Sequence, residues 1–242
     1  MAILKQGSIT LNSGAKGDTG ADGANGGLGK WQGKSIGLFG DSIMDGATFG
    51  NFQTQIENKT GATCTNFGSS GANAGRLVGI MTPIKDRDGV QPATEPDYSL
   101  YDAVVIQIGT NGSPSFGSLT DISVDSYLDI PASYVDDVTY LNTFSDSFYG
   151  NLGICIEYVK AQNENCRIYL LTPPHKSSGG ITIYRDAMIE IGQLYSIPII
   201  NAMDNAGMEE KQYLKYSYDG IHLNTLGNNL WGNYVGEQLN SM

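Results

Sequence analysis

The chain has 242 residues and a formal charge of −11 at pH 7, from 14 Lys and Arg against 25 Asp and Glu. Binding to nucleic acid needs a basic surface, so this charge argues against a nucleic-acid partner. Hydrophobic residues make up 40% of the chain, which is enough to build a packed core and excludes disorder of the whole chain. No apolar run approaches the roughly 18 residues of a transmembrane helix, and residues 1–5 are too short for the apolar part of a secretion signal. We therefore expect a protein that is made without a signal peptide and does not insert into a membrane.

Cysteine and histidine are scarce, which limits the chemistry that the chain can carry. Cys64, Cys155 and Cys166 form an odd, widely spaced set, which is typical of free buried thiols rather than of disulfides or a zinc site. Because His175 and His222 are the only histidines, a His-rich metal site is excluded, and we expect no metal or cofactor. Chemistry that depends on histidine has two candidates.

The N-terminal part differs in composition from the rest of the chain. Residues 1–13 contain one short alternating stretch, Ser8–Leu11, and are expected to form a small anchor segment. Residues 14–29 carry glycine at every third position, the period of a collagen triple helix, in which only glycine fits near the axis. Lys16 and Asp18 flank one of these glycines and are able to pair between staggered chains. The period favours a collagen-like stub that holds a homotrimer, and the alternative is a flexible linker, because the segment has only about five triplets and no proline.

From residue 30 onward, short apolar runs alternate with helical patterns. The runs predict five strands, at residues 35–39, 62–67, 103–108, 167–172 and 197–200. Apolar residues at helical spacing predict helices over residues 51–60, 147–162, 183–195 and 225–239. Continuous apolar strands that alternate with helices indicate a parallel sheet covered on both faces. We therefore expect residues 30–242 to form one α/β domain.

Residues 112–146 interrupt this rhythm with Ser, Thr, Asp, Tyr and Gly. A loop of this length in a compact domain is usually functional. Its aromatic side chains either stack on sugar rings of a substrate or pack the loop itself; they include Phe116, Tyr127, Tyr134 and Tyr140.

Four polar clusters fall at predicted strand ends or in the last connection, which is where open α/β sheets bind ligands. They are Asp41–Ser42, Gly68–Gly71, Gly109–Asn111 and Asp219–His222. Each cluster alone is a weak signal, since Ser42 could cap a helix, Asn111 could serve a turn and Asp219 could cap the last helix. Together, in this order, they indicate acyl transfer.

Acyl transfer by serine needs a base and a site for the oxyanion. His222 can take the proton of Ser42, and Asp219, three residues earlier, can fold back onto the imidazole and fix its tautomer. The tetrahedral intermediate needs donors aimed at its oxyanion. The Ser42 amide, a glycine amide from residues 68–71 and the Asn111 side chain can supply three.

These clusters resemble the blocks of the SGNH hydrolases, the GDSL-like lipase/acylhydrolase family. The nucleophile block is similar to Gly40–Ser42, the glycine block to Asn66–Gly71, the Gly-x-Asn block to Gly109–Asn111 and the Asp-x-x-His block to Asp219–His222. The resemblance covers roughly residues 34–240. It implies a flavodoxin-like three-layer α/β/α sandwich and metal-independent ester hydrolysis by Ser42, Asp219 and His222. It also implies an oxyanion hole formed by Ser42, Gly71 and Asn111.

The fused collagen-like segment, the polar insertion and the missing signal peptide together suggest a particular setting. Short collagen-like segments that join a small anchor to an enzyme resemble phage tail proteins. We expect a carbohydrate O-acetylesterase on a virion tail appendage, with a polysaccharide substrate and other tail proteins as partners. His175, which follows a predicted strand end, is a candidate substrate contact or else a surface histidine. The alternatives are a lipid esterase or thioesterase, a non-enzymatic glycan-binding module and a bacterial cytoplasmic esterase.

Overall fold

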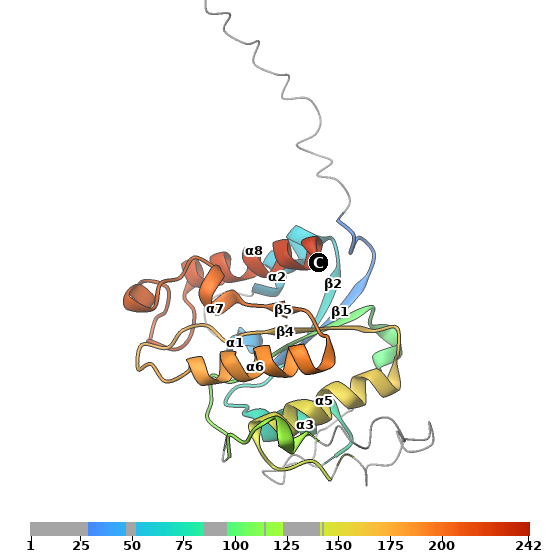
Figure 1. Cartoon of the computed structure of the whole chain (residues 1–242). Coiled ribbons are helices and arrows are strands. Elements are labelled where there is room, and N and C mark those ends of the chain that lie inside the picture. Colours follow the sequence, from blue (N-terminus) through green and yellow to red (C-terminus); the bar gives the residue numbers. More distant parts are fainter. Residues whose placement is uncertain (1–28, 47–51, 85–95, 114, 123–140, 142) are drawn as a thin grey trace, which may run out of the picture.

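The computed structural model describes residues 29–46, 52–84, 96–113, 115–122, 141 and 143–242 (Figure 1). The expected anchor at residues 1–13 and the collagen-like segment up to residue 28 lie outside these described residues. So do Tyr127, Tyr134 and Tyr140 of the insertion.

The centre of the domain is a five-stranded parallel sheet with the strand order β2-β1-β3-β4-β5. Its strands are β1 (Ser35–Gly40), β2 (Thr63–Gly68), β3 (Ala103–Gln107), β4 (Arg167–Leu171) and β5 (Ile199–Ile200). The predicted parallel sheet is confirmed, and its last strand is two residues shorter than the predicted run over residues 197–200. The order reverses between β1 and β3, and such a switch point is where α/β folds place their ligand crevice.

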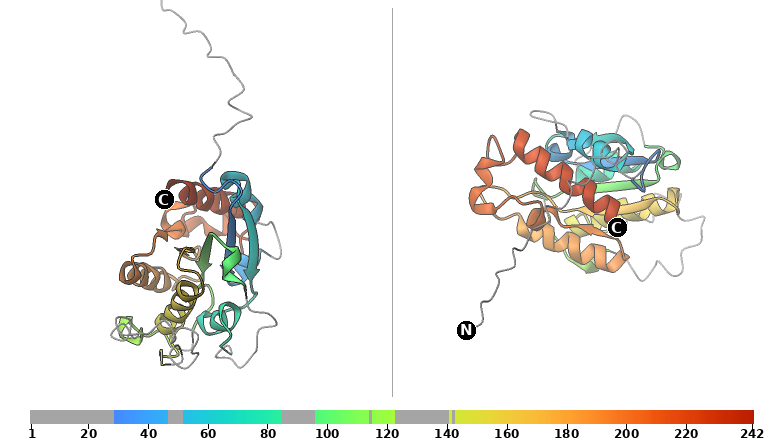
Figure 2. Two further views of the ribbon diagram at one scale, coloured as in Figure 1. Left: turned by 90° about the vertical axis from the view of Figure 1, so that its right-hand side faces the viewer. Right: turned by 90° about the horizontal axis from the view of Figure 1, so that it is seen from above.

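Helices cover both faces of the sheet, which makes the expected three-layer sandwich. They are α1 (Ser42–Asp45), α2 (Phe52–Thr60), α3 (Ala74–Met81), α5 (Phe148–Gln162), α6 (Thr182–Tyr195), α7 (Ala202–Asn205) and α8 (Thr225–Ser241), with 3₁₀ turns η2 (Tyr98–Leu100), η3 (Leu119–Asp121) and η5 (Glu210–Lys215). Figure 1 shows α2, α7 and α8 on one side of the sheet and α3, α5 and α6 on the other. The helices α2 and α8 pack against each other, as Figure 2 shows from above. Among the described helices, none is long and apolar enough to cross a membrane.

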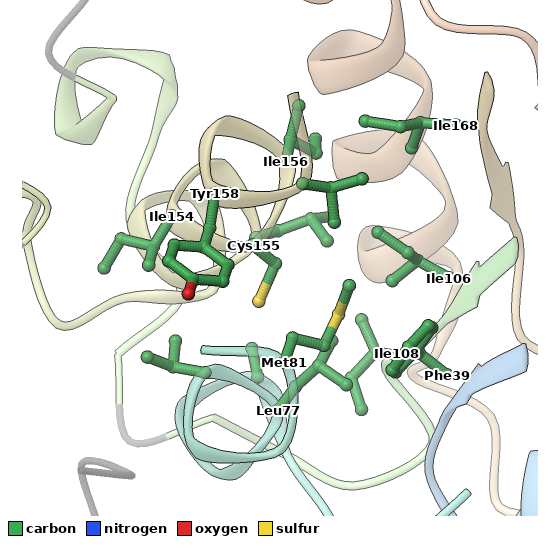
Figure 3. Close-up of a cluster of buried hydrophobic side chains, with 14 of the residues drawn as sticks. Phe39, Leu77, Met81, Ile106, Ile108, Ile154, Cys155, Ile156, Tyr158 and Ile168 are labelled. Carbon is green, nitrogen blue, oxygen red and sulfur yellow. The ribbon is translucent and has the colours of Figure 1, made fainter. Parts of the chain in front are cut away.

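Two hydrophobic clusters hold the layers together, one on each face of the sheet. Alternate residues of a strand point to opposite faces, so Phe39 and Leu38 of β1 enter different clusters. Phe39 joins residues of α3, α5 and α6, and Figure 3 shows side chains from β3, α3 and α5 gathered there. Leu38 joins residues of α2 and α8, among them the fully buried Trp231.

Three of the strands end at the same level. In the register of the sheet, Gly40 at the end of β1 pairs with Gly68 of β2 on one side and with Gln107 of β3 on the other. The segments that follow β1, β2 and β3 therefore begin next to one another at one edge of the sheet. These segments contain three of the four polar clusters.

Candidate active site

Ser42 is the first residue of α1, directly after β1. The N-cap of this helix is Asp41, whose side chain accepts the backbone N–H of Ile43 at 2.9 Å. The possibility that Ser42 is itself the helix cap is therefore wrong. The short helix lies against the end of β2, where a Cβ on Gly68 would collide with the backbone of Asp45. Only glycine allows this close approach.

His222 reaches Ser42 from the loop before α8 and joins it to Asp219. His222 Nε2 lies 2.9 Å from Ser42 Oγ, and His222 Nδ1 lies 2.7 Å from Asp219 Oδ2. The other carboxylate oxygen of Asp219 accepts the backbone N–H groups of Ile221 at 2.9 Å and of His222 at 2.7 Å. The N-cap of α8 is Asn224, not Asp219, so the second capping possibility is also wrong.

The same hydrogen bonds set the ionisation of Asp219. Partial burial by itself raises the pKa of this carboxyl, but hydrogen bonds from the ring and backbone of His222 and from the backbone of Ile221 outweigh it. The net result is a pKa below the ordinary value, so Asp219 is ionised at neutral pH. An ionised carboxylate at Nδ1 leaves Nε2 of a neutral imidazole free to accept a proton.

The two further oxyanion candidates lie on adjoining loops. The Asn111 side-chain amide donates to the carbonyl of Ala72 at 2.9 Å, and Ala72 follows Gly71 directly. A primary amide has two N–H donors, so this contact occupies one of them. Gly71 has φ 75°, in the left-handed region that favours glycine, and a Cβ there would meet no atom within 4 Å. The glycine is therefore required by its backbone conformation and not by lack of space.

Asp41 connects two of these loops, a role that sequence reasoning missed. Its side chain has no exposed surface, and Oδ2 accepts the backbone N–H of Thr110 at 3.1 Å and the amide of Gln107 at 3.2 Å. Burial raises the pKa of Asp41, against the opposing effect of these hydrogen bonds and of the one from Ile43. The sequence signal available was a carboxylate directly after a buried strand, where burial needs several donors.

His175 lies near the His222 loop without any described contact to Ser42. Its half-buried ring packs edge-on against Tyr213, with the centroids 6.3 Å apart, and the Tyr213 hydroxyl donates to the carbonyl of Ile221 at 2.8 Å. Contact between His175 and substrate stays a prediction.

Phe116 packs against the protein. It is the one of the four aromatic residues named above for the insertion that the structure describes. It stacks on Phe148 and contacts Tyr149 and Tyr184 edge-on. Phe116 therefore takes the second of the two roles considered for the insertion's aromatics.

The three cysteines are buried, as expected, and none of them forms a disulfide with another. Burial raises the pKa of Cys64 and of Cys166 to about 12. Cys64 and Cys166 are therefore poor nucleophiles. Within the described part of the chain, no group of three His, Cys, Asp or Glu side chains is arranged to hold a metal ion.

Comparison with known families decides the relationship that the motifs suggested. The model of the GDSL-like lipase/acylhydrolase family matches residues 38–230, a range that contains Ser42, Asn111, Asp219 and His222. The chain belongs to the GDSL-like lipase/acylhydrolase family. Membership implies ester hydrolase activity. No curated protein matches the chain.

Solved structures share the fold of this GDSL-family chain at low identity. A protein from Lactobacillus plantarum is 16% identical, with a TM-score of 0.61 over 87% of this chain and 98% of its own. A chain described as a possible lipase from Chitinophaga pinensis is 16% identical, with a TM-score of 0.58 over 86% of this chain and 98% of its own. The lipase/acylhydrolase from Enterococcus faecalis is 18% identical, with a TM-score of 0.51 over 86% of this chain and 96% of its own. At these identities the likeness concerns the fold.

Proposed function

We propose that this GDSL-family chain is a serine esterase in which Ser42 is the nucleophile, His222 the general base and Asp219 the residue that orients His222. The observation that carries the proposal is the continuous path from Ser42 Oγ through both ring nitrogens of His222 to Asp219, with distances of 2.9 and 2.7 Å. Both lie within the range of a hydrogen bond.

The reaction follows from this path. As Ser42 Oγ attacks the ester carbonyl carbon, its proton passes to His222 Nε2, and the ionised Asp219 stabilises the imidazolium that forms. When the tetrahedral intermediate collapses, the bond to the alcohol breaks and His222 gives its proton to the leaving oxygen. Water then attacks the acyl group on Ser42 by the same route, with His222 again taking the proton and returning it to Ser42.

The negative charge of the intermediate needs donors that are already in place. We assign them to the Ser42 and Gly71 backbone N–H groups and to the second N–H of the Asn111 amide. The loops that carry them are tied together by Asp41 and by the bond from Asn111 to Ala72. Such ties favour catalysis because the donors do not have to reorganise during the reaction.

The proposed substrate is a short acyl ester, an O-acetyl group on a carbohydrate. The described part of the insertion is polar and exposed around Ser118 and Thr120, and it offers no long apolar surface for a fatty chain. The net charge of −11 opposes the approach of strongly anionic glycans and so favours a neutral or acetylated one.

Hydrolysis of p-nitrophenyl acetate and octanoate separates these alternatives. We expect faster turnover of the acetate, no turnover by Ser42→Ala, and release of acetate from an acetylated bacterial surface polysaccharide. Faster turnover of the octanoate would favour a lipid esterase. A wild-type protein that binds glycan without hydrolysing either ester would favour a binding module.

We also propose that the enzyme is carried as a homotrimer on a virion tail appendage, with residues 14–29 as a collagen-like stalk. The support is the glycine period, which is useful only when three chains share an axis. Removal of residues 1–29 should release active monomers, because every proposed catalytic residue lies beyond Lys34. Light scattering that finds the full-length protein monomeric at micromolar concentration would contradict the trimer.

A further inference from the structure

We propose that Tyr218 is a positioning residue for His222, an inference that rests on the proposed function. The two rings are stacked, with centroids 5.6 Å apart and planes inclined by 19°. At this separation the rings are offset rather than face to face, which is the favourable arrangement for aromatic pairs. Tyr218 does not belong to any of the four sequence blocks.

The backbone holds the two rings together independently of the catalytic contacts. The N–H of Tyr218 donates to the carbonyl of His222 at 3.1 Å, and the adjacent residues Ser217 and Leu223 form an antiparallel bridge. Tyr218 and His222 therefore sit across from each other on a narrow loop. Side chains that lie opposite in such an antiparallel pair contact each other.

The stack supplies a restraint that the hydrogen bonds of His222 do not. Ser42 and Asp219 both bind the edge of the imidazole, through Nε2 and Nδ1. Two hydrogen bonds at the edge fix the direction of the ring within its plane but resist tilting of that plane weakly. A ring stacked on one face opposes the tilt and so keeps Nε2 aimed at Ser42.

Exposure makes this restraint more important. The side chain of His222 is 32% exposed and that of Asp219 38% exposed, so water competes for the hydrogen bond between them. Tyr218, itself 43% exposed, covers one face of the imidazole from solvent.

The attraction between the Tyr218 and His222 rings also increases when His222 becomes charged. The face of a tyrosine ring is negative and attracts a cation more than a neutral group. His222 is neutral before attack and becomes an imidazolium as it takes the Ser42 proton. Tyr218 thus favours the charged state that develops in the transition state, which affects kcat more than KM.

Two variants separate the ring face from the hydroxyl group. Tyr218→Phe keeps the face and should leave kcat for p-nitrophenyl acetate within about twofold, whereas Tyr218→Leu should lower kcat about 5- to 10-fold with little change in KM. Leu194→Ala, at the far end of α6 and 38% exposed, is a control that should leave both constants unchanged. Full kcat in Tyr218→Leu, an effect confined to KM, or equal loss in Tyr218→Phe would overturn the inference.

Proton NMR of the imidazole side chains tests the stack without using activity. The chain has only two histidines, and His175→Gln identifies the signals of His222. Ring current should place the His222 signals upfield in the wild type and in Tyr218→Phe, and they should move downfield in Tyr218→Leu. Unchanged signals in Tyr218→Leu would show that the rings are not stacked. A wild type without esterase activity would instead overturn the proposed function, whatever the NMR result.

Discussion

The buried carboxylate of Asp41 accepts the backbone N–H of Thr110 at 3.1 Å, so one side chain links the loop that carries Ser42 to the loop that carries Asn111. The same carboxylate caps α1 through Ile43. The loops of the nucleophile and of one proposed oxyanion donor are therefore tied together by a side chain that has no exposed surface.

Replacement of Asp41 by asparagine should weaken both the fold and the reaction. An asparagine offers only one acceptor oxygen. Its NH₂ group would face N–H groups whose hydrogen bonds Asp41 accepts. Buried groups left unpaired should lower the free energy of unfolding by about 1–3 kcal/mol, as measured by urea denaturation. We expect kcat for p-nitrophenyl acetate to fall by about tenfold or more as Ser42 and Asn111 lose their alignment.

Asp97→Asn is a matched control for this change. Asp97 caps η2 by accepting the backbone N–H of Ser99 at 3.0 Å, as Asp41 does with Ile43, but Asp97 is exposed. Asp97→Asn should lower the free energy of unfolding by no more than about 1 kcal/mol and leave kcat unchanged. Equal effects of the two variants would show that Asp41 acts only as a helix cap.

Gly71→Ala tests the proposed glycine donor of the oxyanion hole. The substitution meets no atom but forces alanine into a backbone conformation with φ 75°, which should cost roughly 1 kcal/mol of stability. A shift of the N–H away from the oxyanion should lower kcat about 10- to 100-fold. Gly207→Ala has the same open surroundings and a φ of 76°, so it should cost similar stability and keep full kcat. If Gly71→Ala also keeps full kcat, the N–H of residue 71 is not a donor.

Asp219 gives the stability of the protein a defined dependence on pH. Its pKa in the folded protein is below the ordinary value of 3.8, so its stabilising effect is present above that pH and is lost as the pH falls through the folded pKa. The unfolding free energies of the wild type and Asp219→Asn should differ by a constant amount above about pH 5 and converge below about pH 4. The difference should be no more than about 1 kcal/mol, because solvent screens this exposed group. A difference that grows as the pH falls, in denaturation curves from about pH 3 to about pH 8, would contradict this assignment.

The sequence predicted those elements whose own residues show a clear apolar pattern. The five strands and the helices α2, α5, α6 and α8 each show a buried run or helical spacing. The helix α3 was missed, since Gly75 and Gly79 lower its helical propensity. It is also only 8 residues long, which is too short for the helical spacing of its apolar residues to repeat clearly.

The candidate site was predicted as far as local motifs reach. Ser42, Asp219 and His222 could be paired because their residue types, in this order, have a shared chemical purpose. The contact of Asp41 with Thr110 depends on the register that sets Gly40 opposite Gln107, and no short segment encodes that register. The position of Tyr218 on His222 was likewise hidden, because a single tyrosine in a loop has no periodic pattern.

The most direct test of the central claim is covalent labelling of the nucleophile. An alkyl fluorophosphonate forms a bond from phosphorus to an activated serine oxygen and releases fluoride, so it marks a serine that has a working base. We predict one adduct per chain, located by mass spectrometry on the peptide that contains Ser42, no adduct in Ser42→Ala, and much slower labelling in His222→Ala. An esterase-active wild type that is labelled on another residue, or a Ser42→Ala variant that is still labelled and active, would contradict the account.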